Sequence, residues 1–234
     1  MGRPIGSKNA EYERRRADLL DAAMPRLLAD QGMTSFNEIA ADVGVSVPTL
    51  RHYFKDRSGL VAAALRHQHR HGASHLARAA VPSSPDLATS LTQFLGELAQ
   101  AWRVFGVGRL FAGGLAMGLR DTAAGPAYLD GILEPTLVAV EARLRAHAAA
   151  GTLALAADDA AGLRAAALSL LAPVVLALLH QDALGGAACR ALDVAAYVQV
   201  HVAAFVRAYG ANSAAVARTT SSRRPRTSRN RPSP

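Results

Sequence analysis

The chain has 234 residues, half of them hydrophobic, and a formal net charge of +8 from 26 Lys and Arg against 18 Asp and Glu. A single cysteine, Cys189, excludes an internal disulfide framework and is typical of a reducing cytoplasm. We expect no signal peptide, because the first residues are polar and basic, and no membrane span, because the most apolar run (residues 165–179) is too short. Ala and Leu dominate over scattered β-branched and aromatic residues, which predicts an all-α protein.

The positive charge is unevenly distributed along the chain. Residues 1–80 carry 12 basic and 8 acidic residues, and residues 81–210 carry 8 and 10. Residues 211–234 carry six arginines and no acid. This last segment has no hydrophobic periodicity and is predicted to be a disordered Arg-rich tail. Net charge alone therefore does not identify a nucleic-acid-binding site.

The N-terminal segment predicts a basic arm followed by a helix. Residues 1–10 are expected to form a flexible arm, in which GRP resembles the core of an AT-hook. Arg3 could then enter a minor groove, or the arm could simply be disordered. The first helix is expected over residues 11–31, where apolar residues recur at helical spacing.

Residues 35–55 predict two short helices joined by a tight turn. Ser35 and Glu38 have the S-x-x-E spacing of a capping box at the start of the first helix. Gly44 follows the last apolar residue and can supply the left-handed backbone that a sharp helix end needs. Ser46 is a good N-cap for the second helix. This outline is that of a helix-turn-helix DNA reader, with residues 11–56 as the domain.

The second helix leaves a chemically mixed set of side chains facing outward. They are Val47, Thr49, Arg51, His52 and Lys55. Arg51 has the fork geometry that reads guanine O6 and N7, and Thr49 can bond a base or touch a thymine methyl. Lys55 and the Tyr53 hydroxyl suit phosphates. A helical hairpin with a solvated polar face is the alternative interpretation.

The segment from residue 17 to residue 65 resembles the DNA-binding domain of the TetR family of bacterial transcriptional regulators. DLLDAAMPRLLADQG and MTSFNEIAADVGVSVPTLRHYFKDRSGL carry the resemblance, although the family often has acidic residues where Ser58 and Gly59 stand. By this resemblance, Lys55 contacts a phosphate, and Thr34 and Ser35 contact the backbone at a helix N-terminus. The other DNA-contacting residues that it implies are Val47, Pro48, Thr49, Arg51, His52 and Tyr53.

A connecting helix is predicted over residues 57–78, with Asp56 as its cap. His67, His71 and His75 recur at i, i+4 and i+8, a spacing that could hold Zn²⁺ or Ni²⁺. A polar helix face is the alternative, and Gly72 interrupts the register. A metal-responsive regulator is thus an alternative function, while the main interpretation needs no cofactor and no metal.

Residues 79–210 predict a larger helical domain. Residues 79–86 contain Pro and Ser residues typical of turns and are expected to form a linker. Ser83 or Ser84 is expected to cap the next helix. The further helices are expected over residues 86–104, 108–119, 127–150, 157–181 and 187–209. The total of about nine helices is the usual number for the TetR family.

The resemblance implies that this domain binds a small effector and forms a homodimer. Residues 163–179 are apolar nearly all round and the last helix has a broad apolar face, which favours a four-helix interface between two subunits over a monomer core. The predicted interface residues are Leu163, Leu168, Leu171, Val175, Leu179, Leu192, Val198, Val202 and Val206. Bulky residues of the middle helices could line an effector cavity or belong to the core, namely Phe94, Trp102, Phe105, Phe111, Met117, Tyr128 and His180.

These patterns predict a sequence-specific regulator in the cytoplasm. We expect a repressor that dimerises on palindromic double-stranded operator DNA and is released by a small, largely apolar effector. A non-specific, nucleoid-type DNA coater driven by the arginine tail is the alternative. The sequence has no Walker loop, no G-x-S-x-G elbow and no H-E-x-x-H, so an enzyme is not expected.

Overall fold

The computed structural model describes residues 5–29 and 33–211, and these residues form eleven α-helices. The expected all-α fold is confirmed, since the described residues hold only one isolated β-bridge, between Leu153 and Gly210. The expected number of about nine helices omits two short ones. These are α7 (Ala124–Tyr128) and α10 (Gly186–Cys189).

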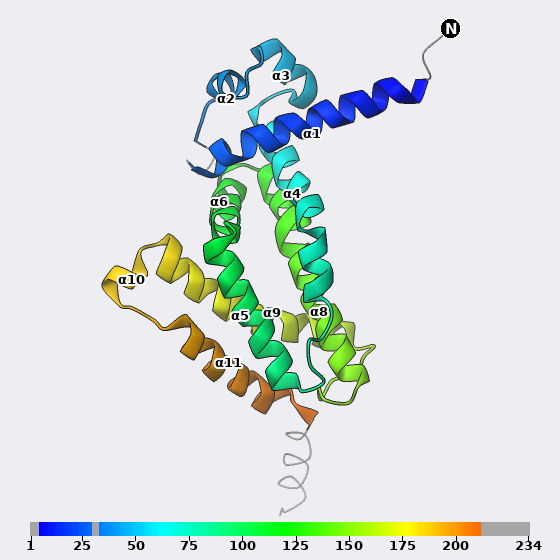
Figure 1. Ribbon diagram of the computed structural model, residues 1–234, viewed down its shortest axis with the longest axis vertical. Coiled ribbons are helices and arrows are strands. Elements are labelled where there is room, and N and C mark those ends of the chain that lie inside the picture. The colour runs from blue at the N-terminus through cyan, green and yellow to red at the C-terminus, as the bar shows by residue number, and fades with distance from the viewer. Residues whose placement is uncertain (1–4, 30–32, 212–234) are drawn as a thin grey trace, which may run out of the picture.

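The first three helices form a small head at one end of the molecule (Figure 1). Helix α1 spans Ile5–Ala29, α2 spans Phe36–Asp42 and α3 spans Val47–Phe54. Their shared core is formed by fully buried apolar side chains, among them Leu20, Leu27, Ile39 and Leu50. The helical periodicity of these residues in the sequence is therefore the periodicity of the buried faces.

Helix α1 begins earlier than the sequence suggests. Residues 5–10 were expected to belong to a flexible arm, but the helix includes them. Extending an existing helix adds one hydrogen bond for each residue ordered, and these six residues include no proline that would stop it. Arg3 lies outside the described residues, and so do residues 212–234 of the predicted tail.

Helix α4 (Arg57–Ala79) leads from the head into the larger domain. Asp56 caps it as expected, with its side chain accepting a hydrogen bond from the Gly59 N–H at 2.8 Å. The helix packs against α1 on the head side and against α7 and α8 in the larger domain. It therefore links the two parts of the molecule, which also touch where α1 packs against α6.

The larger domain is a layered bundle below the head (Figure 1). Its long helices are α5 (Leu87–Val104), α6 (Val107–Arg120), α8 (Glu134–Ala149), α9 (Ala160–Leu178) and α11 (Val194–Tyr209). Two π-helical turns, η1 (Leu129–Leu133) and η2 (Leu179–Ala183), continue α7 into α8 and extend α9. Helix α9 lies against α8 and α11, and α11 also packs on α5.

Two local expectations in this domain are wrong. The cap of α5 is Asp86, which accepts from the Thr89 N–H at 2.8 Å, rather than Ser83 or Ser84. The helix expected over residues 187–209 is split into α10 and α11, because Asp193 starts α11 by accepting from the N–H groups of Ala195 and Ala196. A carboxylate is a strong N-cap in both places.

Residues 160–183, which comprise α9 and η2, are long and apolar enough to cross a membrane by length and composition, with a mean hydropathy of 2.0 over a window of 18 residues. This segment is longer than the run expected from the sequence. One face, which includes Leu163, Leu170 and Val174, is completely buried against neighbouring helices. Core helices of water-soluble folds pass the same test, so the apolar composition has a structural explanation within the bundle.

Candidate DNA-binding site

The start of α2 is fixed by a reciprocal capping box. The Ser35 N–H donates to Glu38 Oε2 at 2.8 Å, and the Glu38 N–H donates to Ser35 Oγ at 3.3 Å. These hydrogen bonds lower the pKa of the Glu38 carboxyl, because they favour its ionised form. Both Ser35 groups are thus already engaged within the protein.

Thr34 does not present its side chain to solvent. Only 4% of it is exposed, and its carbonyl accepts a hydrogen bond from Arg57 Nε at 2.9 Å. In this arrangement the buried side chain is not available to a DNA backbone, so the contact of this residue stays a prediction. Instead, Thr34 ties the beginning of α2 to the beginning of α4.

The turn between α2 and α3 has the backbone that the sequence predicts. Gly44 has a φ of +70° with no atom near the position of a Cβ, so its conformation rather than crowding requires glycine. Ser46 then caps α3, accepting from the Thr49 N–H at 3.2 Å. Its hydroxyl also bonds the Thr49 hydroxyl at 2.7 Å, which holds the Thr49 side chain in place.

Helix α3 separates a buried face from an exposed one. Leu50 and Phe54 are buried, at 0% and 4% exposure, and hold the helix against the head. Val47 and Tyr53 are half-buried. The exposed members of the predicted DNA-contacting set are Ser35, Pro48, Thr49, Arg51, His52 and Lys55. Arg51 and Lys55 thus place two positive charges on the outer side of the helix.

Tyr12 of α1 joins this surface, and the sequence analysis missed it. Its ring stacks on Tyr53 with the centroids 4.8 Å apart, and His52 packs edge-on against both rings. The three rings restrict the positions of His52 and Tyr53. An aromatic residue among the charged residues 11–16 was the only signal in the sequence.

The backbone at Lys55 is strained. It has φ +65° and ψ −60°, and the Asp56 N–H bonds the Phe54 carbonyl at 2.8 Å across it, which is a γ-turn with positive φ. A residue with a Cβ rarely adopts this conformation. Strain of this kind is concentrated at functional positions. Here it places an exposed lysine directly after α3, the predicted recognition helix (called the reading helix below).

Comparison with known proteins agrees with this geometry. Residues 19–64 match the sequence profile of the bacterial regulatory proteins of the tetR family. The chain carries the DNA-binding domain of the TetR family of transcriptional regulators. The match covers almost the whole segment, residues 17–65, in which the resemblance was recognised. Members of the family are DNA-binding regulators rather than enzymes.

Solved structures share the fold over most of the chain. A protein from Mesorhizobium loti assigned to the TetR family has a TM-score of 0.69 at 18% identity, covering 85% of this chain and 98% of that one. A TetR-family regulator from Streptomyces coelicolor has a TM-score of 0.58 at 21% identity, covering 92% and 91%. SmeT, the repressor of the Stenotrophomonas maltophilia efflux pump SmeDEF, has 0.55 at 21%, covering 83% and 90%. No curated protein matches the sequence.

The helix-4 histidines do not form a metal site in the described part of the chain. His67 is buried, and its Nε2 lies 2.8 Å from Asp21 Oδ1 while its Nδ1 lies 2.7 Å from an Arg70 nitrogen. His75 contacts Arg78 at 2.6 Å. The side chain of His71 lies outside the described atoms. The described residues include no cluster of three potential metal ligands.

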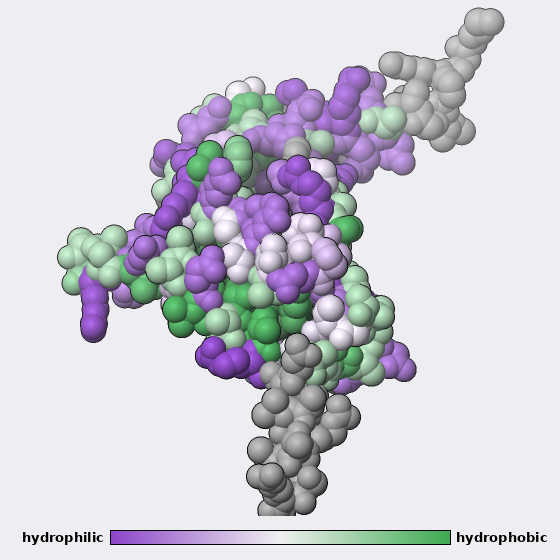
Figure 2. All heavy atoms as spheres, turned by 60° about the horizontal axis from the view of Figure 1, so that its bottom comes forward, coloured by the Kyte–Doolittle hydropathy of each residue, from purple (hydrophilic) through white to green (hydrophobic). Residues whose placement is uncertain are grey.

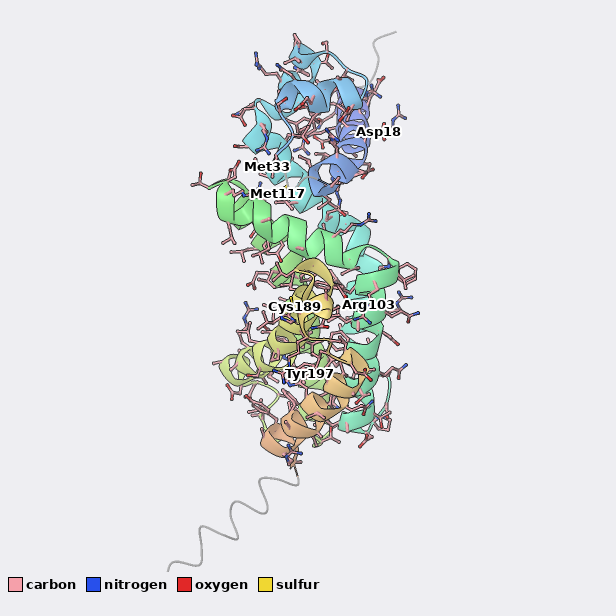
Figure 3. The ribbon with its side chains drawn as sticks, turned by 90° about the vertical axis from the view of Figure 1, so that its left-hand side faces the viewer. Asp18, Met33, Arg103, Met117, Cys189 and Tyr197 are labelled. Atoms are coloured by element: carbon pink, nitrogen blue, oxygen red, sulfur yellow. The ribbon has the colours of Figure 1, made fainter. Side chains whose placement is uncertain are left out.

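The predicted effector-pocket residues divide into two groups. Phe94, Trp102, Phe111, Met117 and Tyr128 are all buried, whereas Phe105 is 72% exposed and His180 is exposed. The last two therefore cannot line an enclosed cavity in this arrangement; both stand where a helix ends, at the C-cap of α5 and in η2. The buried group is spread along the domain: Met117 lies next to the head, and Arg103, which follows Trp102, lies about half-way down (Figure 3).

The predicted dimer residues likewise divide into buried and exposed ones. Leu163, Leu171, Val198 and Val202 are buried inside the chain itself, and Val175, Leu179 and Val206 are half-buried. Only Leu168 and Leu192 are exposed, at 43% and 41%. The sequence analysis missed Leu176 and Val200, each 66% exposed, because helices that are apolar all round do not reveal which face is buried within the chain.

Proposed function

We propose that this TetR-family regulator is a repressor that binds a pseudo-palindromic operator as a homodimer in the cytoplasm. The observation that supports the proposal best is the exposed set on α3, in which Thr49, Arg51 and Lys55 stand on a rigid, doubly capped helix. In a dimer, two such helices would enter successive major grooves about 34–36 Å apart. Arg51 would read a base, and Lys55 would hold a phosphate.

The homodimer is supported by the distribution of apolar surface. Figure 2 shows hydrophilic residues over most of the head and a concentration of hydrophobic residues on the lower part of the molecule. Leu168 and Leu176 on α9 and Val200 on α11 are exposed, and these two helices pack against each other. Pairing them with the same helices of a second subunit would give a four-helix interface with two-fold symmetry.

Release by a small, largely apolar effector is supported by the buried aromatic residues of the middle helices. Trp102 and Phe111 lie with their ring centroids 5.6 Å apart, and burial raises the pKa of Tyr128 to about 12. Tyr128 would therefore act as a neutral hydrogen-bonding group. The fold relative SmeT has been crystallised with triclosan, an apolar aromatic compound, which favours a ligand of this class here as well.

Helix α4 is the element through which effector binding would reach the head. Ser58 Oγ donates to Asp121 Oδ2 at 2.5 Å, which joins the start of α4 to the end of α6. Arg57 joins the same turn to Thr34 at the start of α2. A shift of α6 or α7 around a ligand would thus be passed directly to the reading helices, with a coupling of about 1–3 kcal/mol.

Selection of bound fragments from random DNA, followed by competition binding, tests the proposal. A specific repressor should select one two-fold-related motif and keep it in the presence of excess random DNA. If no motif emerges and random DNA competes equally, the protein is instead a non-specific DNA coater and the proposal fails. Addition of apolar aromatic compounds to the operator complex then tests release.

A further inference from the structure

A hollow of about 510 Å³ is lined by residues of α1 and α4 and by Ala123, which precedes α7. Helix α1 crosses α4 at the base of the head (Figure 1). The polar lining of the hollow is entirely basic and consists of Arg16, Arg66, His67 and Arg70. The rest of the lining is glycine and alanine, so nothing bulky fills the space. Among the residues that the structure describes, none that is acidic lines it. It is separate from the exposed face of α3 and from the buried aromatic residues of the larger domain.

The positive charge of this hollow is incompletely balanced. Arg66 pairs with Asp130 at 3.7 Å, but both side chains are more than half exposed, so the pair is weak. Within the described residues, the guanidinium of Arg16 lies over the Phe54 ring at 5.4 Å and has no ion pair with a carboxylate. Arginine is always protonated, so two cations face the hollow with little compensation.

The third arginine is held by His67. Because Arg70 can only donate, it must donate to Nδ1 of His67, at 2.7 Å. His67 then carries its hydrogen on Nε2 and donates it to Asp21 Oδ1, at 2.8 Å. The His67 ring therefore lies between the Asp21 carboxylate and the Arg70 guanidinium. The guanidinium keeps its other N–H groups for a ligand.

We propose that this hollow binds a small, multiply charged oxyanion, either a phosphate-bearing molecule or a polycarboxylate. Both present several acceptor oxygens that match the fork of a guanidinium. A duplex backbone fits less well, because the hollow begins beside the end of α3 at Gly59 but runs along α4 to Arg70, about 16 Å farther at 1.5 Å per residue. Arg16 belongs to the head and Arg70 to α4, so the anion would bridge these two elements.

An anion that bridges the head and α4 would regulate the protein independently of the effector proposed for the larger domain. Arg16 packs on Phe54, the last residue of the reading helix. An anion that draws Arg16 towards Arg70 would hold the reading helix at a fixed angle to α4. Occupancy should therefore change the unfolding temperature and the relative position of the two elements.

Isothermal titration of the full chain with pyrophosphate and, separately, with citrate tests the site, at ionic strength kept constant with NaCl and without DNA. We expect saturable binding of at least one anion, weakened about tenfold or more in Arg16→Gln and in Arg70→Gln. Arg70→Lys, which keeps the charge, should retain more affinity than Arg70→Gln. The matched control is Arg103→Gln, because Arg103, like Arg70, is exposed but pairs with Asp182 away from the hollow. The affinity of this variant for the anion should equal that of the wild type.

The two anions distinguish the ligand classes, since preference for pyrophosphate indicates a phosphate ligand and preference for citrate a polycarboxylate. Absence of saturable binding, or equal binding by wild type and Arg16→Gln, would overturn the proposal. So would a loss of affinity for random DNA in both variants without any anion binding, which would make the hollow a DNA backbone contact. The measurement involves no operator, so its failure leaves the proposed repressor untouched.

Discussion

At the residue scale, contacts near the end of α3 explain why Ser58 and Gly59 stand where the TetR family often has acidic residues. A Cβ at Gly59 would collide with the Phe54 carbonyl, so the close approach of α4 to α3 requires glycine there. Ser58 donates to Asp121, and this hydrogen bond lowers the pKa of the Asp121 carboxyl. An acidic residue at position 58 would instead face that carboxylate. The departure from the acidic residues common in the TetR family therefore has a local physical reason.

Arg51 and Lys55 should contribute to DNA binding in different ways. Arg51→Ala is expected to cost about 1–3 kcal/mol on the operator and to relax the preference at one base pair, because a bidentate contact is lost. Lys55→Ala should weaken all sequences alike and flatten the salt dependence. Binding titrations with operator variants at several salt concentrations measure both effects. Equal, sequence-blind losses from both changes would contradict the role given to Arg51.

The strained backbone at Lys55 predicts an unusual stability order. Lys55→Gly should unfold with a free energy about 1 kcal/mol higher than that of Lys55→Ala, because glycine adopts a positive φ without steric cost. Both variants lack the ammonium, so the comparison isolates the backbone. Urea denaturation followed by circular dichroism gives the difference. If the two variants are equally stable, the strain is not present in solution.

At the element scale, α4 is held at both ends and in the middle by groups distant in the sequence. Its last carbonyls, of Arg78 and Ala79, accept from the buried guanidinium of Arg143 on α8. Arg143 also bonds the Ser90 hydroxyl at 2.9 Å, and burial lowers its pKa. These contacts supply hydrogen-bond donors to the last carbonyls of a partly buried helix end, which have no partner within the helix.

The π-helical turn η1 touches the middle of α4 through Gly131. A Cβ at this position would overlap the backbone of Leu65, so Gly131→Ala is expected to destabilise the protein by about 1–3 kcal/mol. Gly96→Ala is the matched control, since the site in α5 is exposed and has no atom near a Cβ. It should stabilise the protein by about 0.5–1 kcal/mol through helix propensity. Thermal unfolding of both variants tests the contrast, and a destabilisation shared by both would contradict it.

His147 at the end of α8 should make stability depend on pH. The Thr152 hydroxyl donates to the His147 carbonyl and accepts from Nδ1, while Nε2 is buried without a hydrogen-bond partner in the described residues. Burial and, secondarily, the charge of Arg143 lower the pKa of His147 below its usual 6.5. The folded state therefore binds this proton less readily than the unfolded chain does, and stability is expected to fall as the pH drops below about 6.5.

His147→Asn tests this expectation, because the shorter amide can still donate to Thr152 but does not titrate. Between pH 7.5 and pH 5.5, the wild type should lose more unfolding free energy than the variant, with a slope of at most about 1.4 kcal/mol per pH unit. Urea denaturation at each pH measures this. Parallel pH profiles would show that His147 is not responsible.

At the scale of the whole molecule, the exposed apolar residues of α9 and α11 predict how two subunits meet. Leu176→Lys and Val200→Lys are expected to convert a dimer into a monomer, because each would place a charge in an apolar interface. Val81→Lys, at a residue that is 62% exposed and follows α4, should leave the dimer intact. Light scattering coupled to size-exclusion chromatography measures the mass. A dimer that persists in both interface variants places the contact elsewhere.

Much of the head was predictable from the sequence alone. The capping box at Ser35 and Glu38, the glycine turn at Gly44 and the cap at Ser46 each depend on residues at most three positions apart. Apolar residues at helical spacing then indicate which face of each short helix is buried. The structure of the predicted DNA-binding segment is therefore determined by residues that are close together in the sequence.

Tertiary structure alone decided what lies far apart in the sequence. Helices α9 and α11 are so rich in apolar residues that their composition gives no contrast between faces, and only packing shows that Leu163 is core while Leu176 is exposed. The stacking of Tyr12 on Tyr53, the capping of α4 by Arg143 and the grouping of Arg16 with Arg70 all join different helices. Hydrogen-bonded caps are set by neighbouring residues, whereas which faces and charges meet depends on how whole helices pack.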